Sequence, residues 1–199
     1  MKRKIPLLQA QVLAGNFVAA LSPFCRNVAV AGSVRREEPE VGDIEIVLVP
    51  DVTEVPGLFG PMQEDALKSF PWKAWGKVIK DGERYKQIET RQGVALDIFI
   101  VRPPAQWGVI FMMRTGPEDF SQWMVTPRRK GGGLPSYLRV HAGAIWQGEQ
   151  RISTPTEGDV FRLLGVDYIP PQERKHFIAK IKAGQKQAHQ TQRPRRQQV

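Results

Sequence analysis

Three acidic residues interrupt the most strand-like segments of this 199-residue chain. Asp43 and Glu45 stand one residue apart in the run DIEIVLVP, and Asp97 lies in the later run VALDIFIV. Alternate side chains of a strand share a face, so Asp43 and Glu45 point the same way while the apolar residues between them point into a core. Carboxylates on neighbouring strands repel one another unless cations neutralise them. The pattern therefore predicts a site for two magnesium ions, or manganese in their place, that serves an in-line displacement at phosphorus.

A Gly-Ser turn precedes the acidic pair and supplies the second half of such a site. The segment AGSVRR places Gly32 and Ser33 at the end of a short strand, with Arg36 three residues later. Backbone N–H groups, a hydroxyl and a guanidinium at such a turn suit a phosphate group. An Asp-x-Glu pair alone is more often the wet face of a hairpin. The turn before the pair and the third acid after it favour a combined metal and triphosphate site.

The elements that must position these residues form a strand-rich front half and a helix-rich rear half. In front we expect a helix (residues 5–24), two strands (27–32 and 42–50), a loop with a short helix (51–72) and a β-hairpin (82–101). In the rear we expect two helices (residues 105–116 and 117–133), a meander of short strands (136–153) and a capped helix (154–165). Pro103-Pro104 separates the two halves. This order of elements predicts an α+β protein.

Composition narrows the class of protein. The chain is 41% hydrophobic and 25% charged, which is typical of globular proteins. No apolar run approaches the ~20 residues of a membrane helix, so we expect no membrane partner. The single cysteine, Cys25, excludes an internal disulfide framework and Cys-based zinc sites. We expect a cytoplasmic monomer, and a nucleoid or viral setting would give the same sequence signals.

Positive charge is concentrated near the C-terminus. The net charge is +9, and eight basic residues with no acid follow Glu173. Among them, Lys180, Lys182 and Lys186 are candidate contacts to a nucleic-acid backbone. The Gln-rich end of this stretch is also typical of a disordered, solubilising tail. The sequence leaves both interpretations open.

A second basic group lies in the segment TPRRKGGG. Arg128, Arg129 and Lys130 are candidate contacts to a nucleic-acid backbone. A basic helix end followed by a glycine stop explains the same residues.

The Gly-Ser turn, the acidic pair and the third acid together resemble the nucleotidyltransferase superfamily, and in particular the family X DNA polymerases. The segments GSVRREEPEVGDIEIV and ALDIFI carry this resemblance. KRKIPLLQAQ is similar to the opening of that family's palm, RTGPEDF to its sugar-contacting turn, and TEGDVFRLLGVDYIPPQER to the end of its thumb. The resemblance covers roughly residues 4–174.

The resemblance implies a fold and a division into domains. A nucleotidyltransferase palm, with a mixed β-sheet and helices on one side, would occupy residues 1–103. A small α/β thumb would occupy residues 104–174, and a basic flexible tail would follow at 175–199. This arrangement corresponds to a minimal palm-plus-thumb polymerase.

The resemblance also implies roles for individual residues. Asp43 and Asp97 match the first and third metal-binding acids of the family. Glu45 stands at the second, where polymerases usually carry Asp. Ser33 and Arg36 match the residues that grip the incoming triphosphate.

Four further residues match nucleotide contacts of the family. Gly42 matches the glycine beside the triphosphate grip, and Lys4 falls near a basic triphosphate contact. Thr115 and Gly116 match the turn under the nucleotide sugar, although the aromatic pair before this turn and the serine after it are replaced in this chain.

The leading functional hypothesis is a DNA-directed DNA polymerase of gap-filling repair type. It would bind primer-template or gapped DNA and a nucleoside triphosphate, and it would add nucleotides to a primer 3′-hydroxyl by two-metal-ion catalysis. The alternative is a nucleotidyltransferase that acts on a small-molecule, protein or RNA-end acceptor. A third reading, an inactive nucleic-acid-binding module, is disfavoured by the intact acids.

Overall fold

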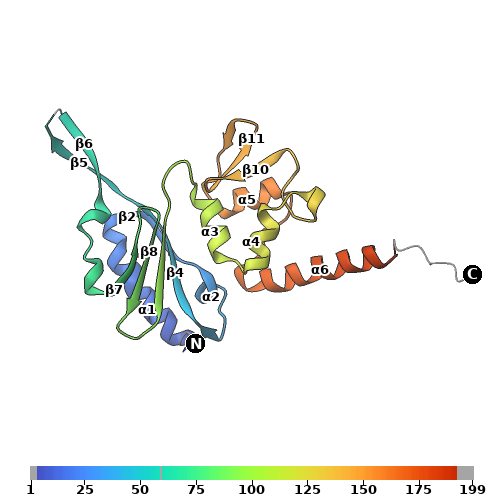
Figure 1. Ribbon diagram of the computed structural model, residues 1–199, viewed down its shortest axis with the longest axis horizontal. Coiled ribbons are helices and arrows are strands. Elements are labelled where there is room, and N and C mark those ends of the chain that lie inside the picture. Colours follow the sequence, from blue (N-terminus) through green and yellow to red (C-terminus); the bar gives the residue numbers. More distant parts are fainter. Residues whose placement is uncertain (1–3, 59, 192–199) are drawn as a thin grey trace, which may run out of the picture.

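The computed structural model describes residues 4–58 and 60–191, with side chains described as far as residue 185 (Figure 1). Two hydrophobic cores lie in succession along the chain. The first gathers residues from 5 to 100, and the second gathers residues from 109 to 181. The structure confirms the α+β class, with a sheet-based front half (the palm) and a helix-rich rear half (the thumb).

The palm holds two helices and nine strands among the residues described, with 3-10 turns at Ser22–Phe24, Ala66–Ser69 and Trp72–Ala74. The helices are α1 (Leu7–Leu21) and α2 (Gly32–Arg35). The strands are β1 (Ile5–Pro6), β2 (Cys25–Val30), β3 (Glu40–Val41), β4 (Asp43–Pro50), β5 (Val52–Gly57), β6 (Gly60–Asp65), β7 (Gly76–Asp81), β8 (Tyr85–Thr90) and β9 (Ala95–Ile100).

Five of these strands form one mixed sheet in the order β2-β4-β9-β8-β7. β4 and β9 run parallel, and the other neighbours are antiparallel. The expected hairpin is β8–β9, whereas the edge strand β7 was not predicted from the sequence.

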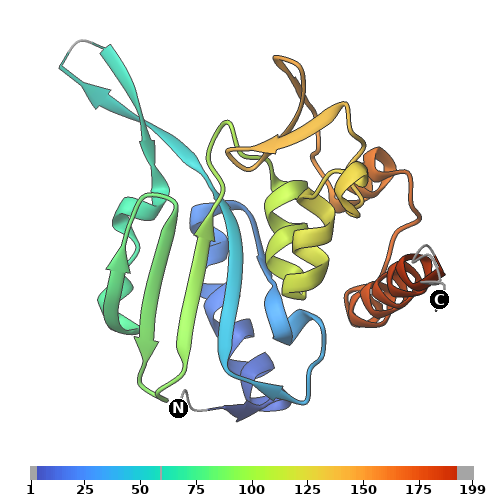
Figure 2. The same ribbon diagram turned by 45° about the vertical axis from the view of Figure 1, so that its right-hand side comes forward.

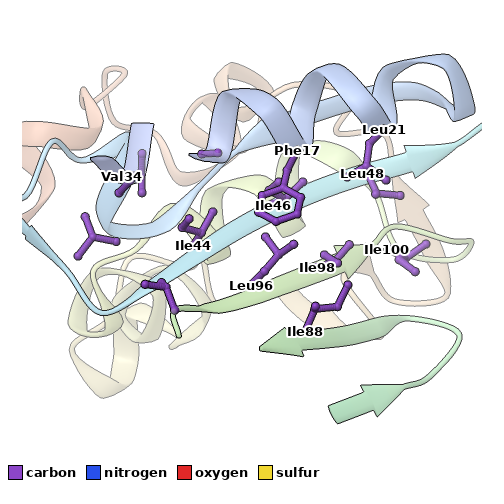
Figure 3. Close-up of a cluster of buried hydrophobic side chains, with 14 of the residues drawn as sticks. Phe17, Leu21, Val34, Ile44, Ile46, Leu48, Ile88, Leu96, Ile98 and Ile100 are labelled. Carbon is purple, nitrogen blue, oxygen red and sulfur yellow. The ribbon is translucent and has the colours of Figure 1, made fainter. Parts of the chain in front are cut away.

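Strict alternation along β4 divides its side chains between two environments. Ile44, Ile46 and Leu48 are fully buried beneath α1 (Figure 3). On the opposite face, Val47 packs in a small cluster that includes residues of the first thumb helix. Asp43 and Glu45 lie on this second face too, nearer the start of the strand. One period-two pattern therefore builds the core and also presents the acids.

Helix α1 packs its inner face on the sheet. Ala10, Ala14, Phe17 and Leu21 are buried there, with Phe17 lying over the middle of the sheet (Figure 3). The sequence analysis expected no apolar run long enough to cross a membrane. Residues 7–24 nevertheless meet the length and composition of such a helix, with a mean hydropathy of 1.3. The inner face packs on the sheet, whereas Leu8 and Val12 of the same helix are exposed.

The loop and short helix expected at residues 51–72 are in part a hairpin, so this prediction was wrong for its first half. β5 and β6 pair antiparallel and project beyond the sheet (Figure 2). Prolines are tolerated in this ribbon because Pro56 and Pro61 face each other on a pair of strands with no further neighbour.

The thumb combines helices with a three-stranded antiparallel sheet, and it has 3-10 turns at Arg128–Lys130 and Pro171–Glu173. Its helices are α3 (Trp107–Thr115), α4 (Glu118–Val125), α5 (Glu157–Leu164) and α6 (Arg174–Thr191). Its strands are β10 (Leu138–His141), β11 (Ala144–Gln147) and β12 (Gln150–Ile152).

Local signals set the ends of α5, which stops at Gly165 as the sequence predicts but begins at Glu157, after the proline that was expected in its first turn. Thr156 and Asp159 form a reciprocal capping box at its start, and Gly165 ends the helix in the left-handed conformation. The capping hydrogen bonds lower the pKa of the Asp159 carboxyl.

The expected flexible tail from residue 175 is helical over its described part, since α6 continues to Thr191. Ile178 is buried in the thumb core, and Phe177 and Ile181 pack against it. Residues 192–199 lie outside the described part of the chain.

A buried ionic cluster ties the palm to the thumb. The Arg35 guanidinium donates to both carboxylate oxygens of Glu157, at 2.9 and 2.6 Å, and Arg174 donates to the same carboxylate at 3.0 Å. Glu157 and Arg174 are buried, and the Arg35 guanidinium also stacks on Phe111 at 3.9 Å. One carboxylate therefore compensates two guanidiniums that come from opposite halves of the protein.

We expect Glu157→Gln to lower the free energy of unfolding by about 3–5 kcal/mol, because it leaves the buried guanidiniums uncompensated. Glu64→Gln is the matched control, since Glu64 pairs with Lys68 on the surface and such pairs contribute below about 1 kcal/mol. Urea denaturation followed by circular dichroism measures both. Equal effects of the two substitutions would contradict the assigned role of Glu157.

Candidate active site

The parallel pairing of β4 and β9 brings the three predicted acids to one place. Glu45 lies directly opposite Asp97 in the register, and Asp43 lies opposite Ala95. Because paired residues project to the same face, the three carboxylates share the face of the sheet that looks toward the thumb.

This arrangement changes the pKa of Glu45. Burial, and next the charge of Asp43, raise the pKa of its carboxyl from 4.5 to about 7. Arg114 and Arg36 act in the opposite direction but do not cancel these effects. Without a bound cation, the site therefore disfavours the simultaneous ionisation of its acids.

The Gly-Ser turn is packed directly against this carboxylate. Gly32 begins α2 with φ +60, and a Cβ atom placed there would lie 1.9 Å from Oε2 of Glu45. Both the backbone conformation and the close approach therefore require glycine at this position.

The same turn carries buried polar atoms that lack a hydrogen-bond partner. Among the described residues, Ser33 Oγ and Arg36 Nε are two of three such side-chain atoms. Glu38 Oε1 lies 3.6 Å from Arg36 Nε, which is beyond hydrogen-bond distance. Unsatisfied buried donors are costly, so their concentration beside the acids indicates a place for an anionic ligand.

Two residues that the sequence analysis missed hold Asp97. The Tyr85 hydroxyl and the Gln87 side-chain amide both donate to Oδ1 of Asp97, at 2.7 and 2.8 Å. Burial, and then the bond to Asp97, raise the pKa of the Tyr85 hydroxyl, which keeps it a donor. Counting the hairpin register back from its turn would have paired Gln87 with Asp97.

An open cavity of about 630 Å³ lies beside the acids, between the sheet and the thumb. Glu45 and Asp97 line it together with the cations Lys80, Arg84 and Arg114. The Arg114 guanidinium stacks on Phe99 at 3.9 Å. The cavity therefore places positive charge around the carboxylates, as a site for a polyanion requires.

The predicted sugar turn docks on the Gly-Ser turn. Thr115 is buried at the end of α3, where its Oγ1 accepts from Arg35 at 2.6 Å and its carbonyl accepts from Arg36 at 2.5 Å. Gly116 follows with φ +57, and a Cβ there would lie 3.3 Å from Nη1 of Arg36. The structure thus brings both predicted turns together, although they are about 80 residues apart in sequence.

Three comparisons with known proteins agree with this geometry. A family model described as "DNA polymerase beta thumb" matches residues 111–175. DNA polymerase lambda of Rattus norvegicus is 28% identical over 160 residues, which takes in 72% of this chain and 28% of the rat protein. A ternary gap complex of Leishmania infantum polymerase beta matches with a TM-score of 0.62 at 16% identity, over 86% of this chain and 71% of that one.

The chain is similar to DNA polymerase lambda in sequence and to polymerase beta in fold, and the matching family model lies in its rear half. It spans less than a third of the length of the rat relative. The thumb match covers α4, α5 and the three-stranded sheet, and the structural match extends the likeness to the palm.

Lys4 and Gly42 are two of the residues matched to nucleotide contacts of family X. Lys4 pairs with Glu40 at 3.4 Å on the surface, with 61% of its side chain exposed. Gly42 has nothing within 4 Å of the position that a Cβ would take. Their assignment to the triphosphate stays a prediction.

In the second predicted basic group, Arg128 links separate segments of the thumb. Its guanidinium donates to the carbonyl oxygens of Gly133 and Leu164. Arg129 and Lys130 are exposed beside it. Nucleic-acid binding by these three residues stays a prediction.

The predicted contacts on α6 differ in their surroundings. Lys182 forms an ion pair with Asp119 of α4. Lys180 is exposed and lines a groove against α4 and the glycines that follow it. The side chain of Lys186 lies outside the described residues.

The donor set suits the divalent cations that family X polymerases require. Within residues 4–58 and 60–191, no three His, Cys, Asp or Glu side chains converge closely enough to form a ready metal site. The carboxylates of Asp43, Glu45 and Asp97 nevertheless share one face, supply the oxygen ligands that magnesium prefers, and repel one another without a cation. These three residues are the ones that would hold it.

The raised pKa of Glu45 predicts a pH-dependent stability. Between pH 4.5 and 7 the unfolded chain releases this proton while the folded protein retains it, so the folded protein loses stability as the pH rises, by about 3 kcal/mol in all. Glu45→Gln cannot ionise. We expect this variant to be more stable than the parent at pH 8 and to differ little at pH 5, in thermal denaturation with a chelator present.

Glu89→Gln is the control for this prediction, because Glu89 is exposed on β8, two strands away from β4 in the same sheet. A stability difference between the Glu45→Gln variant and the parent that is the same at both pH values would contradict it.

Proposed function

We propose that this protein is a DNA-directed DNA polymerase that adds nucleotides to a primer 3′-hydroxyl and fills short gaps. The observation that carries the proposal is the pairing of Glu45 with Asp97 beside a turn whose Ser33 Oγ and Arg36 Nε are buried without hydrogen-bond partners. One half of this arrangement suits divalent cations, and the other suits a triphosphate. The likeness to polymerases lambda and beta supports DNA as the acceptor.

The residues of the site divide the work of nucleotide transfer. Ser33 and Arg36 would bind the triphosphate through charge-assisted hydrogen bonds. Magnesium held by Asp43, Glu45 and Asp97 would neutralise the charge that develops on the reacting oxygens. Asp97, with Tyr85 and Gln87 fixing its Oδ1, would accept the proton of the attacking hydroxyl on its carboxylate.

The position of α3 supports the assignment of the nucleotide to this turn. Its C-terminal Thr115 is anchored by Arg35 at the end of α2 and by Arg36, the next residue. A nucleotide whose phosphates contact Arg36 would therefore have the Thr115–Gly116 turn at hand for its sugar.

We expect Asp43→Asn and Asp97→Asn to reduce nucleotide incorporation by about a thousandfold, because each removes a charged ligand worth several kcal/mol to the transition state. Primer extension on gapped DNA with magnesium measures this effect. Asp167→Asn is the control, since Asp167 is exposed in the thumb. If the protein transfers nucleotides to other acceptors but extends no primer, the proposed DNA polymerase function is wrong and the alternative nucleotidyltransferase function takes its place.

Ser33→Ala isolates the triphosphate contact. Because Ser33 Oγ has no hydrogen-bond partner among the described residues, its loss leaves the protein's own hydrogen bonds intact. We expect the KM for the nucleoside triphosphate to rise about tenfold, as for a lost hydrogen bond to a charged group, with the melting temperature unchanged. An unchanged KM, equal to that of the exposed control Ser153→Ala, would remove Ser33 from the site.

A further inference from the structure

The outer face of the thumb sheet carries a row of three aligned side chains. Trp146 on β11 lies directly opposite Arg139 on β10 and Arg151 on β12. The other face of the sheet packs Leu138 and Ile145 into the thumb core. Arg139 and Arg151 are exposed and Trp146 is half-buried, so this Arg–Trp–Arg row borders solvent.

Hydrogen bonds to backbone carbonyls hold each side chain of the row in place. The Trp146 indole N–H donates to His141 at 3.1 Å, Arg139 donates to Gly148 at 3.0 Å, and Arg151 donates to Pro104 at 3.3 Å. The Arg139 guanidinium lies 5.8 Å from the indole centre. The indole therefore has its polar edge satisfied, with a cation strand-paired on each side.

The row is joined to the cavity beside the acids. Arg84 lines that cavity and donates to the carbonyl oxygen of Pro103, and Arg151 donates to that of Pro104, the next residue. The turn that connects β10 and β11 contributes Ala142 and Gly143 to the cavity wall. A polyanion bound in the cavity thus meets further positive charge along this path.

We propose that the Arg–Trp–Arg row binds the unpaired strand of a nucleic acid, with one base stacked on Trp146 and flanking phosphates on Arg139 and Arg151. An aromatic face between two cations matches a single strand, because every base has a π-face and every linkage carries one negative charge. His141 adds a polar group on the same face, and Glu149 in the β11–β12 turn is the acid nearest in sequence. The proposal rests on the proposed function only in taking nucleic acid as the acceptor.

The experiment measures the binding of labelled DNA by fluorescence anisotropy, without nucleotide and therefore without turnover. Three DNAs are compared: a blunt duplex, the same duplex with a single-stranded overhang, and an oligothymidine single strand. We expect Trp146→Leu to weaken binding of the overhang and single-strand DNAs about tenfold, as for the loss of one stacked base. Binding of the blunt duplex should change less than twofold, and Trp146→Phe should recover part of the loss.

The double substitution Arg139→Gln/Arg151→Gln tests the row without altering the tryptophan. For the single strand it should reduce the slope of log affinity against log salt by about 1.4, at about 0.7 for each phosphate contact. Arg91→Gln is the matched control, because Arg91 is also exposed and also donates to a carbonyl, that of Ala74. It should leave both affinity and slope unchanged.

Equal losses on all three DNAs, or no loss on the overhang DNA, would overturn the proposal. The proposal would also be overturned if polyglutamate displaced the bound DNA as effectively as oligothymidine does. A surface that recognises charge alone would not require stacking on the indole. If the parent protein extends primers while the row variants bind all three DNAs normally, the proposed role of the row is wrong and the proposed polymerase function is retained. If the parent binds none of the DNAs, both proposals fail.

Discussion

Like-charged carboxylates on adjacent strands repel each other, and the parallel pairing of β4 with β9 holds Glu45 and Asp97 in that position. The repulsion is tolerated because the apolar side chains between the acids are fully buried beneath α1, where their burial outweighs the strain. Burial, then the charge of Asp43, and least the charge of Asp97 raise the pKa of the Glu45 carboxyl. Any ligand that brings positive charge to this face is therefore stabilised by relieving a strain that the fold already contains.

The two arginines of the Gly-Ser turn couple this site to the thumb. Arg35 is committed to Glu157 and to the Thr115 hydroxyl, while Arg36 reaches the Thr115 carbonyl and keeps Nε without a hydrogen-bond partner. Structural and binding tasks are thus divided between adjacent residues. The consequence is that the position of α3 relative to the acids depends on the same turn that would hold the triphosphate.

Positive charge in this protein is distributed differently from the simple picture of a basic tail. The described part of the C-terminal stretch is a helix that packs apolar residues on the thumb core. Its Lys182 forms an ion pair with Asp119. The cations that line the cavity beside Glu45 and Asp97 come instead from the palm edge and from α3, at Lys80, Arg84 and Arg114. The thumb sheet extends this surface through Arg139 and Arg151.

The sequence by itself determined the features that depend on local backbone periodicity. The two-residue repeat of a strand placed Asp43 and Glu45 on one face, and the glycines located the turn at Gly32 and the C-terminal end of α5. The hairpin β5–β6 was missed because its prolines and glycines suit loops as well as an isolated ribbon. α6 was missed because its Gln-rich, basic composition masks the apolar residues at helical spacing.

Only the tertiary structure decided which distant residues meet. Glu157 and Arg35 are 122 residues apart, and no local pattern marks either as the partner of the other. Their contact exists because the thumb docks on α2. The row of Trp146 between two arginines likewise depends on the register of three strands, which is fixed by turn geometry and by the burial of the opposite face. Such pairings are set by the packing of whole elements, and one-dimensional spacing carries too little information to specify them.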